Sequence, residues 1–192
     1  MIPMMMRMTV LNSSKHEKKT SRVLTPPARY IIPILAVCVL IFLDQFTKYL
    51  ITDSFALGET RPVIKDVFHL TYIQNAGMAW GLFQGKRFFF LLFTIPVVLL
   101  FSYMYYNIAT LSGKFGLIRV LIVCVVAGAI GNMIDRIRLA YVVDFLDFRL
   151  INFPVFNVAD IFVTCGLILF FVVALFFMNN EDFDKMFKPR RK

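Results

Sequence analysis

The sequence predicts an α-helical integral membrane protein with four membrane-spanning helices. Apolar residues make up 59% of the 192 residues and charged residues only 17%, whereas soluble domains average roughly 45–50% apolar and about 25% charged residues. The apolar residues are also gathered into four long stretches, each near the roughly 20 residues that a helix needs to cross a bilayer. These two observations exclude both an ordinary soluble globule and a disordered chain.

The four stretches define the predicted helices in chain order. They cover residues 30–43 with 49–51, 88–111, 117–134 and 155–178. A basic segment before residues 30–43 is also typical of a cleavable signal peptide. However, the run Asp44-Gln-Phe-Thr-Lys48 follows in place of a small-residue cleavage site, and the apolar residues then resume. We therefore predict that the first helix is retained.

The orientation follows from the basic residues beside the spans, which are more frequent on the cytoplasmic side. Of the 21 Lys and Arg residues, 13 lie in the N-terminal arm, the 112–119 connection and the tail, and 6 lie in the two opposite segments. Both termini should therefore be cytoplasmic. The predicted organisation is a mobile basic arm at 1–29, a membrane domain at 30–178 and a basic tail at 179–192, with extracytoplasmic segments at about 52–87 and 138–155.

The net charge of +9 is explained by this topology and by attraction to anionic lipid headgroups. Aromatic and basic residues are not interleaved, so no nucleic-acid partner is expected. Cys38, Cys124 and Cys165 lie within apolar stretches, at spacings that fit neither a zinc site nor a disulfide framework. We predict that they are small buried hydrophobic residues, and we expect no metal or cofactor.

The first extracytoplasmic segment predicts a small β-sheet that lies on the outer leaflet. Its strand-forming residues are followed by glycines that permit tight turns. These residues are Val63, Phe68, Leu70, Tyr72 and Ile73, with Gly77 and Gly81. Trp80 is a residue type suited to the membrane interface.

Ionisable residues in or beside a span are functional candidates, because they cost several kcal/mol unless they are paired or face water. Asp44 and Lys48 lie four residues apart on one helical face, where they can pair and extend together toward the outer interface. Asp135 and Arg136 end the third span in the run Gly131-Asn-Met-Ile-Asp-Arg136. Adjacent residues diverge on a helix, so each should reach a different partner, and the arginine suits a carboxylate or backbone carbonyls.

Two further aspartates are predicted to meet. Asp144 lies in the run Val142-Val-Asp-Phe-Leu-Asp-Phe148, and Asp160 lies near the start of the fourth span in Phe156-Asn-Val-Ala-Asp160. About twenty residues join the third and fourth spans, which should bring both aspartates to a similar depth. Two close carboxylates share one proton, so one becomes an acid and the other a base that can activate water. Capping of the fourth helix by Asn157 and Asp160 is the alternative explanation.

Taken in this order across four spans, these motifs resemble the lipoprotein signal peptidases, the bacterial type II signal peptidases. The resemblance covers about residues 30–178; Trp80 stands where the family commonly has Phe, and the N-terminal arm is longer than usual. It implies a membrane aspartyl endopeptidase with a small extracytoplasmic β-cradle and a short interfacial helix. The implied catalytic pair is Asp144 and Asp160. The implied substrate-binding or supporting residues are Asp44, Lys48, Asn75, Gly77, Asn132, Asp135, Arg136 and Asn157.

The implied reaction is removal of the signal peptide from prolipoproteins, on the amino side of the diacylglyceryl-modified cysteine. It would take place at the outer leaflet of the bacterial cytoplasmic (inner) membrane, with residues 52–87 holding the peptide from above. The implied partners are the prolipoprotein substrates and membrane lipid, and we expect a monomer.

Three other functions fit parts of the pattern. Membrane aspartates also build proton or cation pathways in transporters and channels, but those charges usually lie near the midplane, whereas these gather at one interface. A purely structural protein would leave the positions of the Asn and Asp residues unexplained. A metal-dependent hydrolase could use Asp135, Asp144, Asp147 and Asp160, and insensitivity to chelators would exclude it.

Overall fold

The computed structural model describes residues 27–77 and 87–188. Within these residues, four helices are long and apolar enough to cross a membrane, which confirms the predicted fold class. A three-stranded antiparallel sheet and a short final helix complete the described part. The elements are α1 (Ala28–Ser54), β1 (Thr60–Ile64), β2 (Phe68–Asn75), α2 (Arg87–Ile108), α3 (Phe115–Leu139), β3 (Val142–Phe148), the 3-10 helix η3 (Arg149–Ile151), α4 (Val158–Phe177) and α5 (Asn180–Phe187).

The helices match the predicted spans, with shifted ends. α1 runs unbroken through the polar interruption at 44–48. α3 extends to Leu139, beyond the predicted end, so residues 135–136 are helical. α4 begins at Val158 because the side chain of Asn157 accepts a hydrogen bond from the first turn and caps the helix.

Some predictions concern residues outside those that the structure describes. They are the mobility of the arm at 1–26, the interfacial position of Trp80, the turn at Gly81 and the end of the basic tail at 189–192. The last residues of the predicted arm are helical, because α1 already begins at Ala28.

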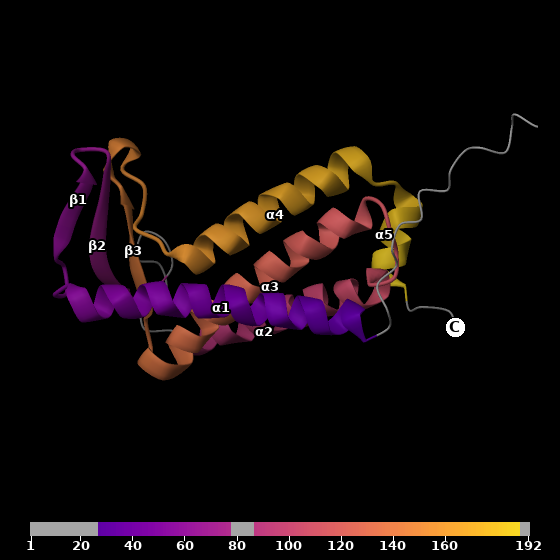
Figure 1. Ribbon diagram of the computed structural model, residues 1–192, viewed down its shortest axis with the longest axis horizontal. Coiled ribbons are helices and arrows are strands. Elements are labelled where there is room, and N and C mark those ends of the chain that lie inside the picture. Colours follow the sequence, from indigo (N-terminus) through magenta and orange to yellow (C-terminus); the bar gives the residue numbers. More distant parts are fainter. Residues whose placement is uncertain (1–26, 78–86, 189–192) are drawn as a thin grey trace, which may run out of the picture.

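The helices form an elongated bundle that has the sheet at one end and α5 at the other (Figure 1). α1 starts and α4 ends near α5, and the connection from α2 to α3 lies at this end too. The end of α1, the end of α3 and the start of α4 lie at the sheet end. β3 lies beside the start of α4, since Leu146 and Phe156 form an isolated β-bridge.

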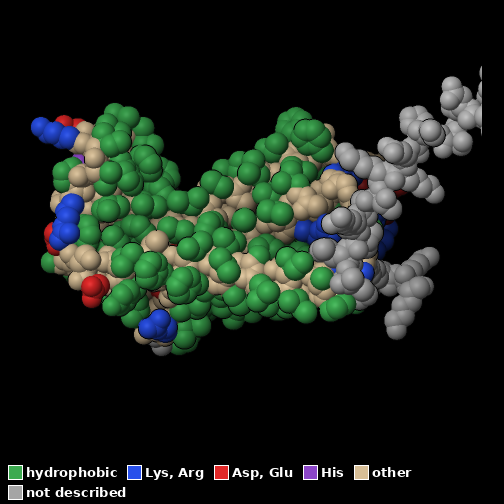
Figure 2. Space-filling model, viewed as in Figure 1, with side chains coloured by type: hydrophobic (Ala, Val, Ile, Leu, Met, Phe, Trp, Pro, Cys, Tyr) green, Lys and Arg blue, Asp and Glu red, His purple; other side chains and the backbone are tan. Residues whose placement is uncertain are grey.

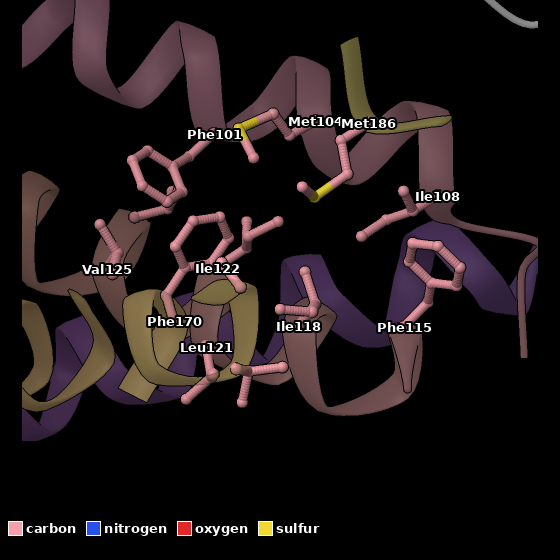
Figure 3. Packing of buried hydrophobic residues seen from close by; sticks show 13 residues of the cluster. Phe101, Met104, Ile108, Phe115, Ile118, Leu121, Ile122, Val125, Phe170 and Met186 are labelled. Atoms are coloured by element: carbon pink, nitrogen blue, oxygen red, sulfur yellow. The ribbon is translucent and has the colours of Figure 1, made fainter. Parts of the chain in front are cut away.

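The hydrophobic core joins α2, α3, α4 and α5 (Figure 3). The rings of Phe101 and Phe170 meet edge to face, 5.4 Å apart, and Met186 of α5 is completely buried in the same cluster, next to Met104. The outer faces of the helices are also apolar: Leu175 and Phe176 are each 75% exposed. Exposed apolar surface of this extent is expected where helices face lipid.

Small residues allow α3 and α4 to pack closely. A Cβ atom on Gly166 would lie 2.8 Å from Cγ2 of Val125, and one on Gly128 would lie 2.9 Å from Cγ2 of Val163. Glycine at such positions is typical of helix interfaces in membranes. The close packing brings the start of α4 against the end of α3.

The sheet has the order β1–β2–β3 and contains a bulge in β2. Leu70 pairs with Leu146 and Ile73 pairs with Asp144, so two residues of β2 lie opposite Phe145 alone. The sheet predicted from residues 52–87 is therefore confirmed, and β3 adds a third strand from the other extramembrane segment.

The sheet is amphipathic. Figure 2 shows apolar side chains on the side that faces the hollow above α4, and charged side chains on the opposite side. The short helical turn η3, which follows β3, adds two exposed apolar side chains to this surface. They are Leu150 and Ile151, each 69% exposed. This distribution suits a sheet that rests on a lipid surface, and so supports the predicted position on a leaflet.

α5 closes the bundle at the end opposite the sheet. Asn179 and Asp182 form a capping box at its start, and Lys114 forms an ion pair with Asp182. Nδ2 of Asn107 donates to the carbonyl oxygen of Met186 at 2.8 Å. This segment was expected to be only a basic tail, but residues 180–187 form a helix.

The cysteines differ from their prediction in burial. All three are free thiols, but Cys38 and Cys165 are exposed on the apolar exterior of the bundle and Cys124 is half-buried. An apolar stretch does not distinguish a residue that faces the core from one that faces lipid, because both environments are apolar.

Candidate active site

The candidate site lies where α4 begins, beside β3 and the ends of α1 and α3. Asp144 on β3 is 2% exposed, and Asp160 lies in the first turn of α4. The N–H groups of Phe145 and Leu146 both donate to the carbonyl oxygen of Phe156, at 2.9 and 2.8 Å. The strand that carries one aspartate is thus bonded directly to the segment that begins the helix of the other.

Two asparagine side chains connect the aspartates. Nδ2 of Asn157 donates to Oδ1 of Asp144 at 2.7 Å and to Oδ1 of Asn132 at 3.1 Å. Nδ2 of Asn132 donates in turn to Oδ1 of Asp160 at 2.7 Å. This chain of hydrogen bonds, here called the amide bridge, fixes the two carboxylates relative to each other.

Asp160 also takes part in the capping box of α4. Its Oδ2 accepts from the N–H of Asn157 at 3.1 Å, while Oδ1 of Asn157 accepts from the N–H of Asp160 at 3.0 Å. The predicted capping is therefore confirmed. Capping uses only one carboxylate oxygen of Asp160, and the other oxygen belongs to the amide bridge.

A buried ion cluster of Asp44, Lys48 and Asp135 lies behind the amide bridge, with no member more than 3% exposed. Nζ of Lys48 lies 2.9 Å from an oxygen of Asp44 and 2.9 Å from one of Asp135, and donates to Oδ1 of Asn132 at 3.0 Å. Nε2 of Gln45 donates to both carboxylates, at 3.1 and 2.9 Å. The cluster therefore orients the Asn132 amide, with its oxygen toward Lys48 and its nitrogen toward Asp160.

The ion cluster has two carboxylates for one ammonium group, so further donors are needed. Oδ1 of Asp44 accepts from the N–H of Ala159 at 3.0 Å, at the positive end of the α4 dipole. Oδ2 of Asp135 accepts from the N–H of Val143 at 3.2 Å. These bonds attach α1 to the start of α4 and α3 to β3. Gly131 leaves room for them, because a Cβ atom there would lie 2.6 Å from Oδ2 of Asp44.

Asn75 and Arg136 complete the polar part of the site. Nδ2 of Asn75 donates to Oδ2 of Asp144 at 2.8 Å, and Oδ1 of Asn75 accepts from the N–H of Gly77 at 2.9 Å. The guanidinium group of Arg136 donates to the carbonyl oxygen of Gly77 at 3.5 Å and lies over the ring of Phe90, 4.5 Å from its centroid. Arg136 thus holds the residues that follow β2 against α2 and α3.

The environment of Asp144 favours its protonated form. Burial, together with the nearby negative charge of Asp160, raises the pKa of Asp144 from 3.8 to about 7, although hydrogen bonds from Asn75 and Asn157 act in the opposite direction. The site can therefore hold one proton near neutral pH, and a carboxyl pair in this state offers both an acid and a base.

Both aspartates line a cavity of about 910 Å³ between α2, α3, α4 and the loop that precedes α4. The cavity is polar beside the aspartates and largely apolar elsewhere, where Phe93 and Val97 of α2 face Val163 and Leu167 of α4. A peptide carbonyl can meet the carboxyl groups at the polar end while apolar groups fill the remainder.

The structure brings all ten predicted site residues to this one place. They are Asp44, Lys48, Asn75, Gly77, Asn132, Asp135, Arg136, Asp144, Asn157 and Asp160. The predicted pairing of Asp44 with Lys48 is confirmed, but their predicted extension toward the interface is wrong: both point into the bundle, because α3 and α4 supply partners there. Gln45 was missed, and its only signal in the sequence was its place beside Asp44.

Comparison with known proteins places the chain in a family. The family model described as Signal peptidase (SPase) II matches residues 36–177. The chain belongs to the signal peptidase II family. The Lipoprotein signal peptidase of Halothermothrix orenii is 47% identical to this signal peptidase II over 135 residues, 70% of this chain and 89% of the relative. That of Brevibacillus brevis is 47% identical over 133 residues, 69% of this chain and 87% of the relative.

Two solved structures share the fold of this signal peptidase II. A bacterial membrane enzyme structure obtained by the in meso method at 2.3 Å resolution has a TM-score of 0.69 and 32% identity, over 85% of this chain and 96% of that chain. A second such structure, at 1.9 Å, has a TM-score of 0.69 and 34% identity, over 78% of this chain and 96% of that chain. This signal peptidase II is therefore an aspartic-type peptidase and a multi-pass bacterial membrane protein. α5 lies beyond the residues that the family model matches.

Proposed function

We propose that this enzyme removes the signal peptide of prolipoproteins by means of a water molecule activated by Asp144 and Asp160, and that it cuts on the amino side of a diacylglyceryl-modified cysteine. Its family supports prolipoproteins as the substrate class. The observation that carries the mechanism is the amide bridge, which joins the two carboxylates at the polar end of the apolar cavity.

In the proposed reaction the aspartates share one proton. The ionised carboxylate takes a proton from the water as the water oxygen attacks the scissile carbonyl carbon, and the protonated partner donates to the carbonyl oxygen. When the tetrahedral intermediate collapses, the carbon–nitrogen bond breaks and a carboxyl group returns a proton to the leaving amine. The products are a signal peptide with a new carboxylate and a lipidated chain with a free amino group.

The supporting residues act by position. Asn132 and Asn157 hold the carboxylates, and Asn75 holds Asp144 from the opposite side. The lipid chains of the substrate remain in the bilayer while the peptide enters the polar end of the cavity. Because the substrate is already anchored beside the site, the reaction behaves as an intramolecular one, which lowers the barrier.

The geometry disfavours the metal-dependent alternative. Both oxygens of Asp135 are engaged, by Gln45 and by Lys48. The carboxylate of Asp147 binds Thr71 on another face of the sheet. Two of the four carboxylates that such a site would need therefore serve other partners.

The test uses the purified enzyme in lipid nanodiscs with a lipidated and an unlipidated precursor, and detects the shortened product by mass spectrometry. We expect the wild type to process only the lipidated precursor and to keep its rate in excess chelator. Asp144→Asn and Asp160→Asn should each lose activity by a factor of about a thousand or more, since each removes an acid–base group. Asp66→Asn is the matched control, because Asp66 is an exposed turn residue with φ of 59°, a conformation that asparagine tolerates. Wild-type rates in both dyad variants would refute the proposal.

We also propose that the α5 end is cytoplasmic and that the sheet and the site lie at the outer leaflet. The distribution of basic residues supports this orientation, with 13 in residues 1–29, 112–119 and 179–192, against 6 in the opposite segments. A cysteine-free variant carrying either Lys65→Cys, in the exposed turn between β1 and β2, or Ser112→Cys tests it in intact cells. A membrane-impermeant maleimide should label the first and spare the second, and the reverse pattern would overturn the orientation.

A further inference from the structure

A further polar network lies in the sheet, apart from the amide bridge and the ion cluster, and its members Thr71 and Asp147 are buried. The hydroxyl of Thr71 donates to Oδ2 of Asp147 at 2.6 Å, and Nε of Arg149 donates to the same oxygen at 2.9 Å. The hydroxyls of Thr60 and Thr71 lie 2.8 Å apart, and Arg149 also donates to Thr60 at 2.8 Å. Asp147 is only 8% exposed, so this carboxylate is buried without any part in the proposed chemistry.

The network lies at the bulge of β2. Thr71 and its neighbour Tyr72 are the two residues that face Phe145 alone. The N–H and C=O groups of Tyr72 bond to the segment before β1, to the carbonyl oxygen of Glu59 at 3.0 Å and to the N–H of Gly58 at 2.9 Å. The bulge is thus held by backbone bonds on one side of β2 and by the Thr71–Asp147 bond on the other.

The bulge determines which residue of β2 lies beside Asp144. With the bulge present, Ile73 pairs with Asp144 and Asn75 pairs with Val142. Without it, the pairing that starts at Leu70 and Leu146 would continue unshifted, and Asn75 would move by one residue along β3. One residue corresponds to about 3.3 Å along a strand, which exceeds what the 2.8 Å bond between Asn75 and Asp144 can absorb.

We infer that Asp147 is a positioning residue of this enzyme: through Thr71 it locks the β2 bulge that holds Asn75 against Asp144. The inference rests on the proposed function, since it assigns Asp147 a part in the same reaction. Asp147 does not touch the cavity, and its effect passes through Thr71, the bulge and Asn75 in that order.

The test compares variants that remove or keep the Thr71 hydroxyl. Thr71→Val is nearly isosteric but cannot donate to Asp147, whereas Thr71→Ser keeps the donor. We expect Thr71→Val to lower kcat by about tenfold while KM changes by less than about twofold, and Thr71→Ser to restore kcat to within about threefold of wild type. Asp147→Asn keeps an acceptor oxygen but loses the charge that Arg149 binds, so its kcat should lie between these two. Arg61→Gln, which removes an exposed ion pair at the edge of β1, is the control and should leave kcat unchanged.

Two further readouts separate positioning from general stability. The Asn75 hydrogen bond lowers the pKa of Asp144, so loss of the lock should move the alkaline limb of the kcat–pH profile, where the protonated carboxyl ionises, to higher pH, as Asn75→Ala should do. The double variant Thr71→Val/Asn75→Ala should be no slower than Asn75→Ala alone, because both changes break one chain of contacts. The thermal midpoint of each purified variant is recorded in the same preparation.

Unchanged kcat and an unshifted alkaline limb in both Thr71→Val and Asp147→Asn would overturn the inference. So would strictly additive losses in the double variant. Failure of the proposed function gives a different result, namely full activity in Asp144→Asn and Asp160→Asn. If Thr71→Val does not fold, the comparison of Asp147→Asn with Thr71→Ser decides the question through the pH profile.

Discussion

Nζ of Lys48 lies 3.0 Å from Oδ1 of Asn132, and Nδ2 of that amide lies 2.7 Å from Oδ1 of Asp160. A positive charge buried on α1 therefore reaches the proposed catalytic pair through one neutral amide. This arrangement fixes which way the Asn132 amide is turned without placing an ammonium group in the cavity. Lys48 thereby serves two parts of the site at once: it pairs with both carboxylates of the ion cluster and it orients the amide bridge.

Lys48→Met should be among the most destabilising single changes in the protein. It leaves Asp44 and Asp135 buried without their cation, and breaking a buried ion pair in this way costs about 3–5 kcal/mol. The free energy of unfolding in a mild detergent measures the loss. Lys65→Met, in the exposed turn between β1 and β2, is the control with the same chemical change. A triple variant that adds Asp44→Asn and Asp135→Asn should recover part of the stability, and no recovery would contradict this explanation.

Gly131→Ala and Gly116→Ala should have opposite effects although both lie in α3. A Cβ atom at Gly131 would lie 2.6 Å from Oδ2 of Asp44, so the substitution should cost about 1–3 kcal/mol and reduce activity. At Gly116 the nearest atom is Nη2 of Arg119 at 3.8 Å, and a helical Gly→Ala change there should stabilise by about 0.5–1 kcal/mol. Thermal midpoints and cleavage rates measured on the same samples check both expectations. Equal effects would show that the close approach of α1 to α3 is not what Gly131 provides.

Asp144→Asn should stabilise the protein more at high pH than at low pH. The pKa of Asp144 is raised from 3.8 to about 7, so between these values the folded state binds more protons than the unfolded state. Stability contributed by this group therefore falls as pH rises through that window, and the full shift corresponds to roughly 4 kcal/mol. We expect the difference in unfolding free energy between variant and wild type to grow from about pH 4 to about pH 7. A difference that stays constant would exclude the raised pKa; any loss of hydrogen bonds is the same at both pH values and cancels.

Met186→Ala should loosen the bundle at the end remote from the sheet. Met186 is completely buried, and removal of such a side chain typically costs about 2–5 kcal/mol. Cleavage at low temperature should remain near wild type, because α5 touches no residue of the site. Phe187→Ala, on the neighbouring and 49% exposed residue, should cost much less. A loss of activity without a loss of stability in Met186→Ala would contradict a purely structural role for α5.

The residue pattern predicted the elements better than it predicted their contacts. The four-residue spacing of Asp44 and Lys48 was sufficient to predict their ion pair, because that spacing places both on one helical face. Their direction depends on partners 84 to 115 residues away in the chain, at Asn132, Asp135 and Ala159. No local pattern contains that information, so the expected turn toward the interface was wrong.

The capping box of α5 and the bulge of β2 were both missed, but only the first could have been predicted from the sequence. The capping box of α5, formed by Asn179 and Asp182, has a recognisable spacing and could have been predicted. The bulge at Thr71 could not, because it arises where β2 meets both β1 and β3 and has no glycine to mark it. The proposed role of Asp147 depends on that bulge, which is why the sequence suggested it only as a metal ligand.

The cavity beside Asp144 and Asp160 is rimmed by exposed apolar side chains, among them Phe93 and Ile161. An inhibitor that entered the cavity past these residues would reach it from the hydrocarbon phase of the bilayer and not from the surrounding water. The concentration that determines inhibition would then be the number of inhibitor molecules per lipid molecule. Inhibition constants obtained at different detergent or liposome amounts would diverge when expressed as molar concentrations and coincide when expressed as mole fractions.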